Sequence, residues 1–217
     1  NPFNTLLSLS ENLVFNEDIE KKKKKSIHQL IYDSARRGYN LLENLLEWSR
    51  AQTGRLKPDP KTININEIIQ EKIFFTENAA QIKNITVENT TQEKIYACAD
   101  RIMVETIIRN LLTNAIKFTG KGGKITINAK KISDTFIEIA VADSGIGIKK
   151  ENLDKLFRID VNFTTSGTKN EVGTGLGLII CKEFVEKNNG TIKVNSKYGQ
   201  GSTFLFTLPI AKKQQEA

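Results

Sequence analysis

The feature that most constrains the fold is an apolar stripe of helical period between residues 27 and 48. Apolar or small residues recur there at alternating spacings of four and three, and leucines at 30, 42 and 46 widen the stripe. The series is Ile27, Ile31, Ser34, Gly38, Leu41, Leu45 and Trp48. The pattern predicts a long amphipathic helix that ends near Gly54 and must bury one face against another element.

A shorter helical segment precedes this helix. Its apolar residues are Phe3, Leu6, Leu7, Leu13 and Val14, and residues 16–18 interrupt the pattern. The run Lys21 to Lys25 is expected at a solvated turn. The two segments predict an antiparallel hairpin, which cannot enclose its own stripes. We expect it to complete a four-helix bundle in a homodimer, the alternative being that it packs onto the rest of the same chain.

Charge and composition exclude several classes of function. The net charge is +7, but the 25 acidic residues are dispersed and the basic excess lies in the lysine run, which favours an acidic partner protein over nucleic acid. No stretch is apolar enough for a membrane helix, so we expect a cytoplasmic fragment without membrane contact, whether or not the intact protein is anchored. Cys98 and Cys181 are expected to be buried free thiols.

A proline-containing linker divides the chain. Pro58 and Pro60 predict a hairpin at 1–54, a linker at 55–61, a second domain at 62–211 and a tail at 212–217. In the second domain we expect helices at 66–83, 101–118 and 174–187 and strands at 85–88, 94–99, 124–132, 135–143, 191–196 and 202–209. The predicted fold class is α+β, a sandwich with helices on one face of a mixed sheet.

The predicted helix 101–118 carries Asn110, Asn114 and Lys117 on its polar side. A carboxamide oxygen is a suitable ligand for magnesium, which takes its remaining ligands from water and phosphate, and the lysine supplies a neighbouring positive charge. Two asparagines on a helix are also ordinary surface residues. The helix alone therefore leaves both interpretations open.

Two glycine-containing motifs follow. After a predicted strand, Asp143 with Gly145 and Gly147 could form a tight turn in which the aspartate accepts a hydrogen bond from the adenine amine, or a purely structural turn. Further on, residues 173–177 open a predicted helix, where free N–H groups suit phosphate. The polar residues before Gly173 distinguish this motif from the dinucleotide fingerprint.

In this order, the three elements resemble the ATP-binding domain shared by histidine kinases, gyrase-type topoisomerases, heat-shock chaperones and mismatch-repair ATPases. Residues 110–119 are similar to the N box of histidine kinases, 143–147 and 173–177 to the two G boxes, and 156–158 to the F box. Residues 45–50 resemble the end of a dimerisation and phosphotransfer domain. The resemblance covers nearly the whole chain and implies that ATP and Mg²⁺ are the cofactors.

The resemblance also implies roles for individual residues. Asn114 would coordinate magnesium, Asn110 would support the phosphate and metal region, and Lys117 and Arg158 would neutralise phosphate charge. Phe118 would lie against adenine, Asp143 would bind its amine, and Thr203 would reach the base through water. Gly145 and Gly147 would shape the adenine pocket, residues 159–172 would form a mobile lid, and Gly173, Thr174, Gly175, Leu176 and Gly177 would bind phosphate.

Asn110 occupies the position where the ATP-hydrolysing relatives carry a glutamate that activates water, which favours a kinase over an ATP-hydrolysing clamp. The phosphorylated histidine would lie four residues upstream of Asn1, and its phosphate would pass to an aspartate of a response-regulator receiver domain. His28 lies off the stripe and is expected to be a solvated residue, so the chain as given should not autophosphorylate. A non-catalytic scaffold that binds nucleotide and dimerises is the alternative.

Overall fold

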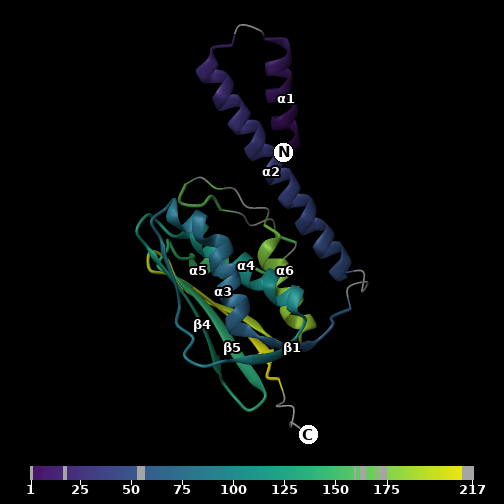
Figure 1. Ribbon diagram of the computed structural model, residues 1–217, viewed down its shortest axis with the longest axis vertical. Coiled ribbons are helices and arrows are strands. Elements are labelled where there is room, and N and C mark those ends of the chain that lie inside the picture. The colour runs from purple at the N-terminus through teal and green to yellow at the C-terminus, as the bar shows by residue number, and fades with distance from the viewer. Residues whose placement is uncertain are drawn as a thin grey trace. The chain divides into compact units, whose positions relative to one another are not determined.

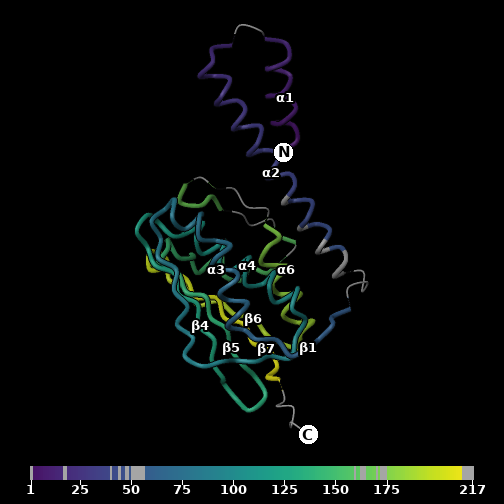
Figure 2. Tube along the Cα trace, in the orientation of Figure 1, coloured from purple at the N-terminus to yellow at the C-terminus, as the bar shows by residue number. Residues whose placement is uncertain are grey.

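The computed structural model describes residues 2–16, 19–52, 57–158, 160–161, 165–169, 171 and 175–211 (Figures 1 and 2). The chain divides into two compact units, residues 1–52 and 53–217. None of the described helices has both the length and the apolar character that crossing a bilayer requires.

The first unit is a hairpin of two helices, α1 (Pro2–Phe15) and α2 (Lys21–Gln52) (Figure 1). The start of α1 lies against the middle of α2, because a Cβ atom on Gly38 would sit 3.2 Å from the Phe3 ring. Ile27 and Ser34 on the same face of α2 are buried. This part of the stripe is therefore covered by α1, as the antiparallel hairpin predicted.

The lysine run is helical, which corrects the prediction of a turn. α2 begins at Lys21, and the backbone N–H of Lys24 donates to the carbonyl of Glu20 over 2.9 Å. Lysine is a good helix former because its unbranched side chain loses little rotamer freedom there, while its ammonium group stays in water. His28 is exposed on the same helix, as expected.

The second unit is built on a mixed five-stranded sheet. Its strand order is β2 (Thr86–Asn89), β4 (Lys124–Lys131), β5 (Phe136–Asp143), β7 (Gly201–Pro209) and β6 (Ile192–Lys197). β2 and β4 are parallel, and the other neighbours are antiparallel. The mixed sheet is as predicted.

A separate pair of short strands joins β1 (Lys61–Asn64) to β3 (Tyr96–Ala99). β1 was not predicted, and Lys61, assigned to the linker, is its first residue. Alternate residues of β3 are buried, so Ala97 and Ala99 point inward and Cys98 is exposed, against the prediction of a buried thiol. Cys181 is buried as expected, and neither cysteine forms a disulfide in the part of the chain that the structure describes.

Three helices cover one face of the five-stranded sheet: α3 (Ile65–Gln81), α4 (Arg101–Phe118) and α6 (Gly177–Lys187) (Figures 1 and 2). A short helix, α5 (Lys150–Leu153), was not predicted. The inward residues Ile137, Ile139 and Val141 of β5 are buried beneath the helices. This arrangement confirms the α+β sandwich.

Two polar residues fix α4 relative to α6. Asp100 caps the N-terminus of α4, accepting a hydrogen bond from the backbone N–H of Met103 over 3.0 Å. Asn188, at the end of α6, accepts from the backbone N–H of Asp100 over 2.7 Å and donates to the carbonyl of Phe184 over 2.7 Å. Because Asn188 is buried, these bonds are not replaced by water if its side chain is removed.

We therefore predict that Asn188→Ala lowers the free energy of unfolding by about 2 kcal/mol, since it strands the N–H of Asp100 in the interior. Urea denaturation followed by circular dichroism measures this change. Lys182→Ala, on the exposed face of α6, is the control and should change stability by less than about 0.5 kcal/mol. Equal stability of the two variants would contradict the proposed coupling of α4 to α6.

Candidate functional site

The turn after β5 is held tightly between two other elements. Oδ1 of Asp143 accepts a hydrogen bond from the backbone N–H of Gly145 over 2.8 Å. A Cβ atom on Gly145 would lie 2.4 Å from the carbonyl oxygen of Phe118, and one on Gly147 would lie 2.1 Å from that of Lys197. Gly147 also has a φ angle of +65°. Both positions therefore require glycine.

The carboxyl group of Asp143 is largely buried. Burial raises its pKa above the ordinary value, against the opposing effect of hydrogen bonds from the backbone of Gly145 and Ser202. A partly desolvated carboxylate that is held in place by backbone donors is a strong and directional acceptor for an amine. This geometry suits the role that the sequence predicted for Asp143.

The strand register shows how Thr203 lies relative to Asp143, and the role assigned to Thr203 stays a prediction. β5 and β7 pair Asp143 with Ser202 and Ala142 with Thr203, and directly opposite residues project from the same face of a sheet. Ser202 is buried on the helix-covered face with Asp143, whereas Thr203 projects from the other face. Both residues line a hollow of about 370 Å³, but their side chains lie on opposite sides of the sheet.

Ser202 is thus a neighbour of Asp143 that sequence reasoning did not single out. The signal was present, because Phe204, Phe206 and Leu208 follow it at every second position and mark the inward face of the strand. The hydroxyl of Ser202 lies 2.9 Å from that of Ser196 on the neighbouring strand β6.

The polar side of α4 faces the beginning of α6. Asn110 and Asn114 lie one helical turn apart and are both half-buried. Oδ1 of Asn110 is 3.3 Å from the position that a Cβ atom of Gly177 would occupy, so glycine permits the close approach of α6. Nδ2 of Asn110 is buried without a hydrogen-bond partner among the described residues. An unpaired buried donor beside a second carboxamide fits a phosphate group with its magnesium ion.

The start of α6 supplies backbone N–H groups at the same place. Its N-cap residue, Leu176, provides no capping side chain, and Gly175 just before it has a φ angle of +78°. The first N–H groups of a helix have no partner within the helix and favour anions. Gly173 and Thr174 lie outside the described residues, so their assigned role stays a prediction.

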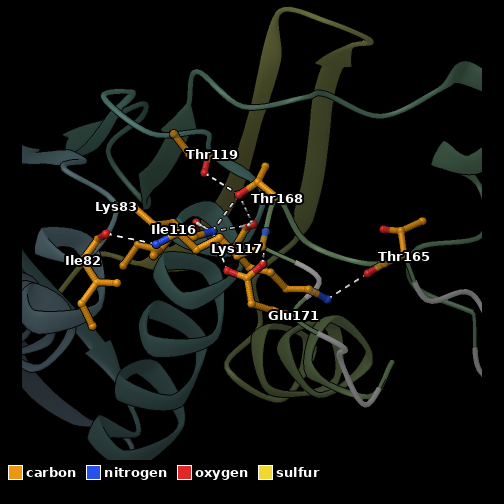
Figure 3. Close-up of polar contacts among 9 residues, drawn as sticks. Ile82, Lys83, Ile116, Lys117, Thr119, Thr165, Thr168 and Glu171 are labelled. Atoms are coloured by element: carbon orange, nitrogen blue, oxygen red, sulfur yellow. Dashed lines mark hydrogen bonds and ion pairs between the residues drawn. The ribbon is translucent and has the colours of Figure 1, made fainter.

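Lys117, in the last turn of α4, donates from Nζ to the carbonyl oxygen of Thr165 over 3.0 Å (Figure 3). Its ammonium group is also 4.6 Å from the centroid of the Phe118 ring. Burial lowers the pKa of Lys117; the charge of Glu171 opposes this shift and that of Lys83 adds to it. The ammonium group is thus partly desolvated, as a phosphate-binding cation can be.

The structure brings some of the predicted residues together and leaves others apart. The backbone N–H of Ile146 donates to the carbonyl oxygen of Phe118 over 3.1 Å, which joins the aspartate turn to the end of α4. Arg158 is exposed and pairs with Asp160, its Nε lying 3.0 Å from Oδ1, so a phosphate contact would require exchange of this ion pair. The predicted site therefore assembles around the C-terminal half of α4.

Within the described part of the chain, no group of three or more histidine, cysteine, aspartate or glutamate residues could hold a metal ion. An ion at Asn114 would therefore take its remaining ligands from water and from phosphate oxygens, which is the usual coordination of magnesium with a nucleotide.

Comparison with known proteins gives the family of the second unit. Residues 99–212 match the model of the family described as histidine kinase-, DNA gyrase B- and HSP90-like ATPase. This range contains the N, G and F motifs and the strands that support them.

Individual relatives match over nearly all of the chain. The sensor-like histidine kinase SenX3 of Mycobacterium tuberculosis is 29% identical over 96% of this chain and 50% of the relative. The non-motile and phage-resistance protein of Caulobacter vibrioides is 28% identical over 99% of this chain and 26% of the relative. The chain thus spans between about a quarter and half of the length of these relatives.

Solved structures match as well. The crystal structure of histidine kinase ThkA in complex with response regulator protein TrrA has a TM-score of 0.78 and 26% identity, over 97% of this chain and 58% of that one. A catalytic domain of ThkA alone gives a TM-score of 0.61 and 32% identity, over 70% of this chain and 96% of that one.

The raised pKa of Asp143 predicts a pH-dependent cost to stability. A carboxyl group with a higher pKa in the folded state is ionised first in the unfolded chain, so stability falls as the pH rises from about 4, the usual value for aspartate, through the folded value. Asp143→Asn should therefore gain stability relative to the wild type over this pH range and keep the gain above it. Urea denaturation at several pH values measures the difference.

The matched control is Asp134→Asn, which changes an exposed aspartate in the turn between β4 and β5. Its stability relative to the wild type should not vary with pH in this way. An Asp143→Asn difference that is as independent of pH as that of the control would contradict a raised pKa for Asp143.

Proposed function

Because this chain belongs to the histidine kinase-, DNA gyrase B- and HSP90-like ATPase family, and within it to the sensor histidine kinases of two-component systems, we propose that it uses Mg-ATP to phosphorylate a histidine upstream of Asn1. The phosphate would then pass to an aspartate of a response-regulator receiver domain. The observation that carries the proposal is the buried and unpaired Nδ2 of Asn110, a residue whose Oδ1 lies against the start of α6 and which is one helical turn from Asn114.

The adenine end of the nucleotide would lie at the turn after β5. Asp143 accepts a hydrogen bond from the exocyclic amine, and the close packing of Gly145 against Phe118 and of Gly147 against Lys197 fixes the turn that carries it. Phe118, whose carbonyl holds this turn, would lie against the ring. Ser202 takes the supporting position that the sequence assigned to Thr203, because it shares the face of Asp143.

The phosphate end would lie between α4 and α6. Asn114 is the proposed ligand of magnesium, which when bound neutralises charge on the transferred phosphoryl group. Nδ2 of Asn110 donates to a phosphate oxygen, and Lys117 and Arg158 supply positive charge. The backbone at residues 173–177 completes the phosphate site.

Asn110 also bears on the reaction itself. A carboxamide cannot remove a proton from water, so the site lacks a general base at the position where the hydrolysing relatives carry glutamate. Hydrolysis of ATP is then not promoted, and the γ-phosphate stays available for transfer to the imidazole of the upstream histidine. A ring nitrogen forms the new bond to phosphorus, the bond to the β-phosphate oxygen breaks, and ADP leaves. The imidazole proton would pass to the acidic residue that follows the histidine in the motif of the family that the chain resembles.

The hairpin, residues 1–54, is proposed as the dimerisation and phosphotransfer domain, and residues 62–211 as the catalytic domain. Leu42, Leu45 and Leu46 are exposed on α2 and lie beyond Gly38, the residue that Phe3 contacts. An upstream helical segment that carries the histidine, together with a second copy of the hairpin, would cover these leucines. The response-regulator partner is proposed by analogy with ThkA, which was crystallised with TrrA.

The first test restores about ten native residues upstream of Asn1, a little under three helical turns at 3.6 residues per turn, and incubates the protein with γ-labelled Mg-ATP. We expect acid-labile, base-stable label on the extended chain because its histidine is now present. The original chain and the extended Asp143→Asn variant should remain unlabelled, and the extended His28→Gln variant should label normally.

Absence of label on an extended chain that binds nucleotide tightly would instead favour a non-catalytic nucleotide-binding scaffold. Rapid release of free phosphate without label on protein would favour an ATP-hydrolysing clamp. Label on His28 would show that the acceptor had been assigned wrongly.

The dimer is tested by Leu45→Glu, which places a charge on the exposed part of the stripe. We expect a dimeric wild type and a monomeric variant by light scattering, since burying an unpaired carboxylate in a bundle costs several kcal/mol, or roughly a thousandfold in affinity. His28→Glu, on the same helix but off the stripe, is the control and should remain dimeric. A dimeric Leu45→Glu variant would exclude this surface as the interface.

A further inference from the structure

A buried lysine outside the N, G and F motifs connects three parts of the catalytic unit. Lys83 follows α3, and its side chain is 4% exposed. Burying an ammonium group is costly unless acceptors surround it.

Four acceptors surround Nζ of Lys83, as Figure 3 shows. Two are the carbonyl oxygens of Ile116 and Lys117 in the last turn of α4, at 2.8 and 3.0 Å. The others are Oγ1 of Thr168 at 2.8 Å and Oε1 of Glu171 at 2.5 Å. An ammonium group has three N–H donors, so these acceptors occupy all of its capacity. Lys83 therefore has no donor left for a ligand.

Thr168 and Glu171 belong to a segment that we call the strap, residues 165–169 with Glu171. The strap is bound to the end of α4 by its own bonds as well. The backbone N–H of Thr168 donates to the carbonyl of Lys117 over 3.0 Å, and its hydroxyl donates to the carbonyl of Thr119 over 2.9 Å. Glu171 accepts from the backbone N–H of Lys169 over 2.7 Å.

The position of Lys83 is itself fixed by the backbone. Its N–H donates to the carbonyl of Ala80, and its carbonyl accepts from the N–H of Gly122, both over 3.1 Å. Asn84, the next residue, has a φ angle of +51°, which completes the turn out of α3. The ammonium group therefore extends from a fixed backbone toward the last carbonyls of α4, which carry the negative end of the helix dipole.

The strap in turn restrains Lys117, the proposed phosphate-binding lysine. Thr165 accepts from its Nζ over 3.0 Å, and a Cβ atom on Gly167 would lie 2.5 Å from its Cγ, so the strap backbone packs along its stem. The pKa of Lys117 is lowered by burial, with Glu171 opposing the shift and Lys83 adding to it. The ion pair and the phosphate-binding lysine are thus close enough to affect each other.

We propose that Lys83 and Glu171 form a latch that holds the strap against the end of α4 and so orients Lys117 for phosphate. This inference rests on the proposed function and extends it to two positioning residues. A side chain oriented before binding loses less conformational entropy when the ligand arrives, so the latch slows nucleotide release. Breaking it leaves Lys117 in place but less restrained.

The test measures release of a fluorescent, methylanthraniloyl-labelled ATP in the presence of Mg²⁺, by stopped-flow displacement with excess ATP. Glu171→Gln removes the charge from a side chain that is 36% exposed, and Lys83→Met removes the ammonium group at similar length. We expect each to speed release roughly three- to tenfold, which is less than the direct loss of a charged hydrogen bond to the ligand would cause, because the latch acts on the nucleotide only through Lys117. The double variant should release nucleotide no faster than Lys83→Met.

Two further variants distinguish an effect on the release rate through the orientation of Lys117 from an effect through general loss of structure. In a Lys117→Met background, Glu171→Gln should change the release rate less than about twofold, because the oriented group is absent. The control is Glu105→Gln, which weakens a different ion pair between α3 and α4, that of Glu105 with Lys72 at 2.8 Å. This variant should release nucleotide at the wild-type rate.

Wild-type release rates in Glu171→Gln, or an equal effect of Glu171→Gln with and without Lys117, would overturn the latch while leaving the proposed function intact. A wild-type protein that does not bind the labelled nucleotide would overturn the proposed function, and the latch with it.

Discussion

The packing of α4 is the constraint on which the rest of the catalytic unit depends. Ile107, Ile108, Leu111 and Leu112 are fully buried, so the helix cannot turn about its axis without exposing apolar surface. With that face fixed, the 3.6-residue period of the helix places Asn110 and Asn114 toward the start of α6. The geometry of the candidate site is therefore set by the hydrophobic core beneath it.

The last turn of α4 organises the loops around the site. The final carbonyls of a helix have no partner within it and must be satisfied from outside. Here three different segments supply the donors: the N–H of Ile146 to Phe118, the N–H of Thr168 to Lys117, and Nζ of Lys83 to Ile116. Hydrogen bonds to the last carbonyl groups of α4 thus hold together the aspartate turn, the strap and the end of α3.

Structural features that depend on neighbouring residues could be predicted from the sequence. Features that depend on pairing between residues far apart in the chain could not. The bounds of α4 followed from its apolar period, and the structure confirms them. β1 is four residues long and exists because Lys61 pairs with Ala99, which no local pattern indicates. Thr203 was singled out from the sequence and its neighbour Ser202 was not, although one residue along a strand reverses the face and Ser202 is the one that shares the face of Asp143. The latch was missed because Lys83 and Glu171 are far apart in sequence.

Buried polar groups around α4 fall into two kinds, and the difference bears on function. Lys83 has protein acceptors for every donor, so its burial is compensated by the protein itself and fits a role in positioning. Nδ2 of Asn110 has no partner among the described residues, and burial raises the pKa of Asp143. A fold selected for stability alone would not retain these two groups, because apolar residues of similar size would cost less. A ligand that donates a hydrogen bond to Asp143 at one end and accepts one from Nδ2 of Asn110 at the other would offset both costs.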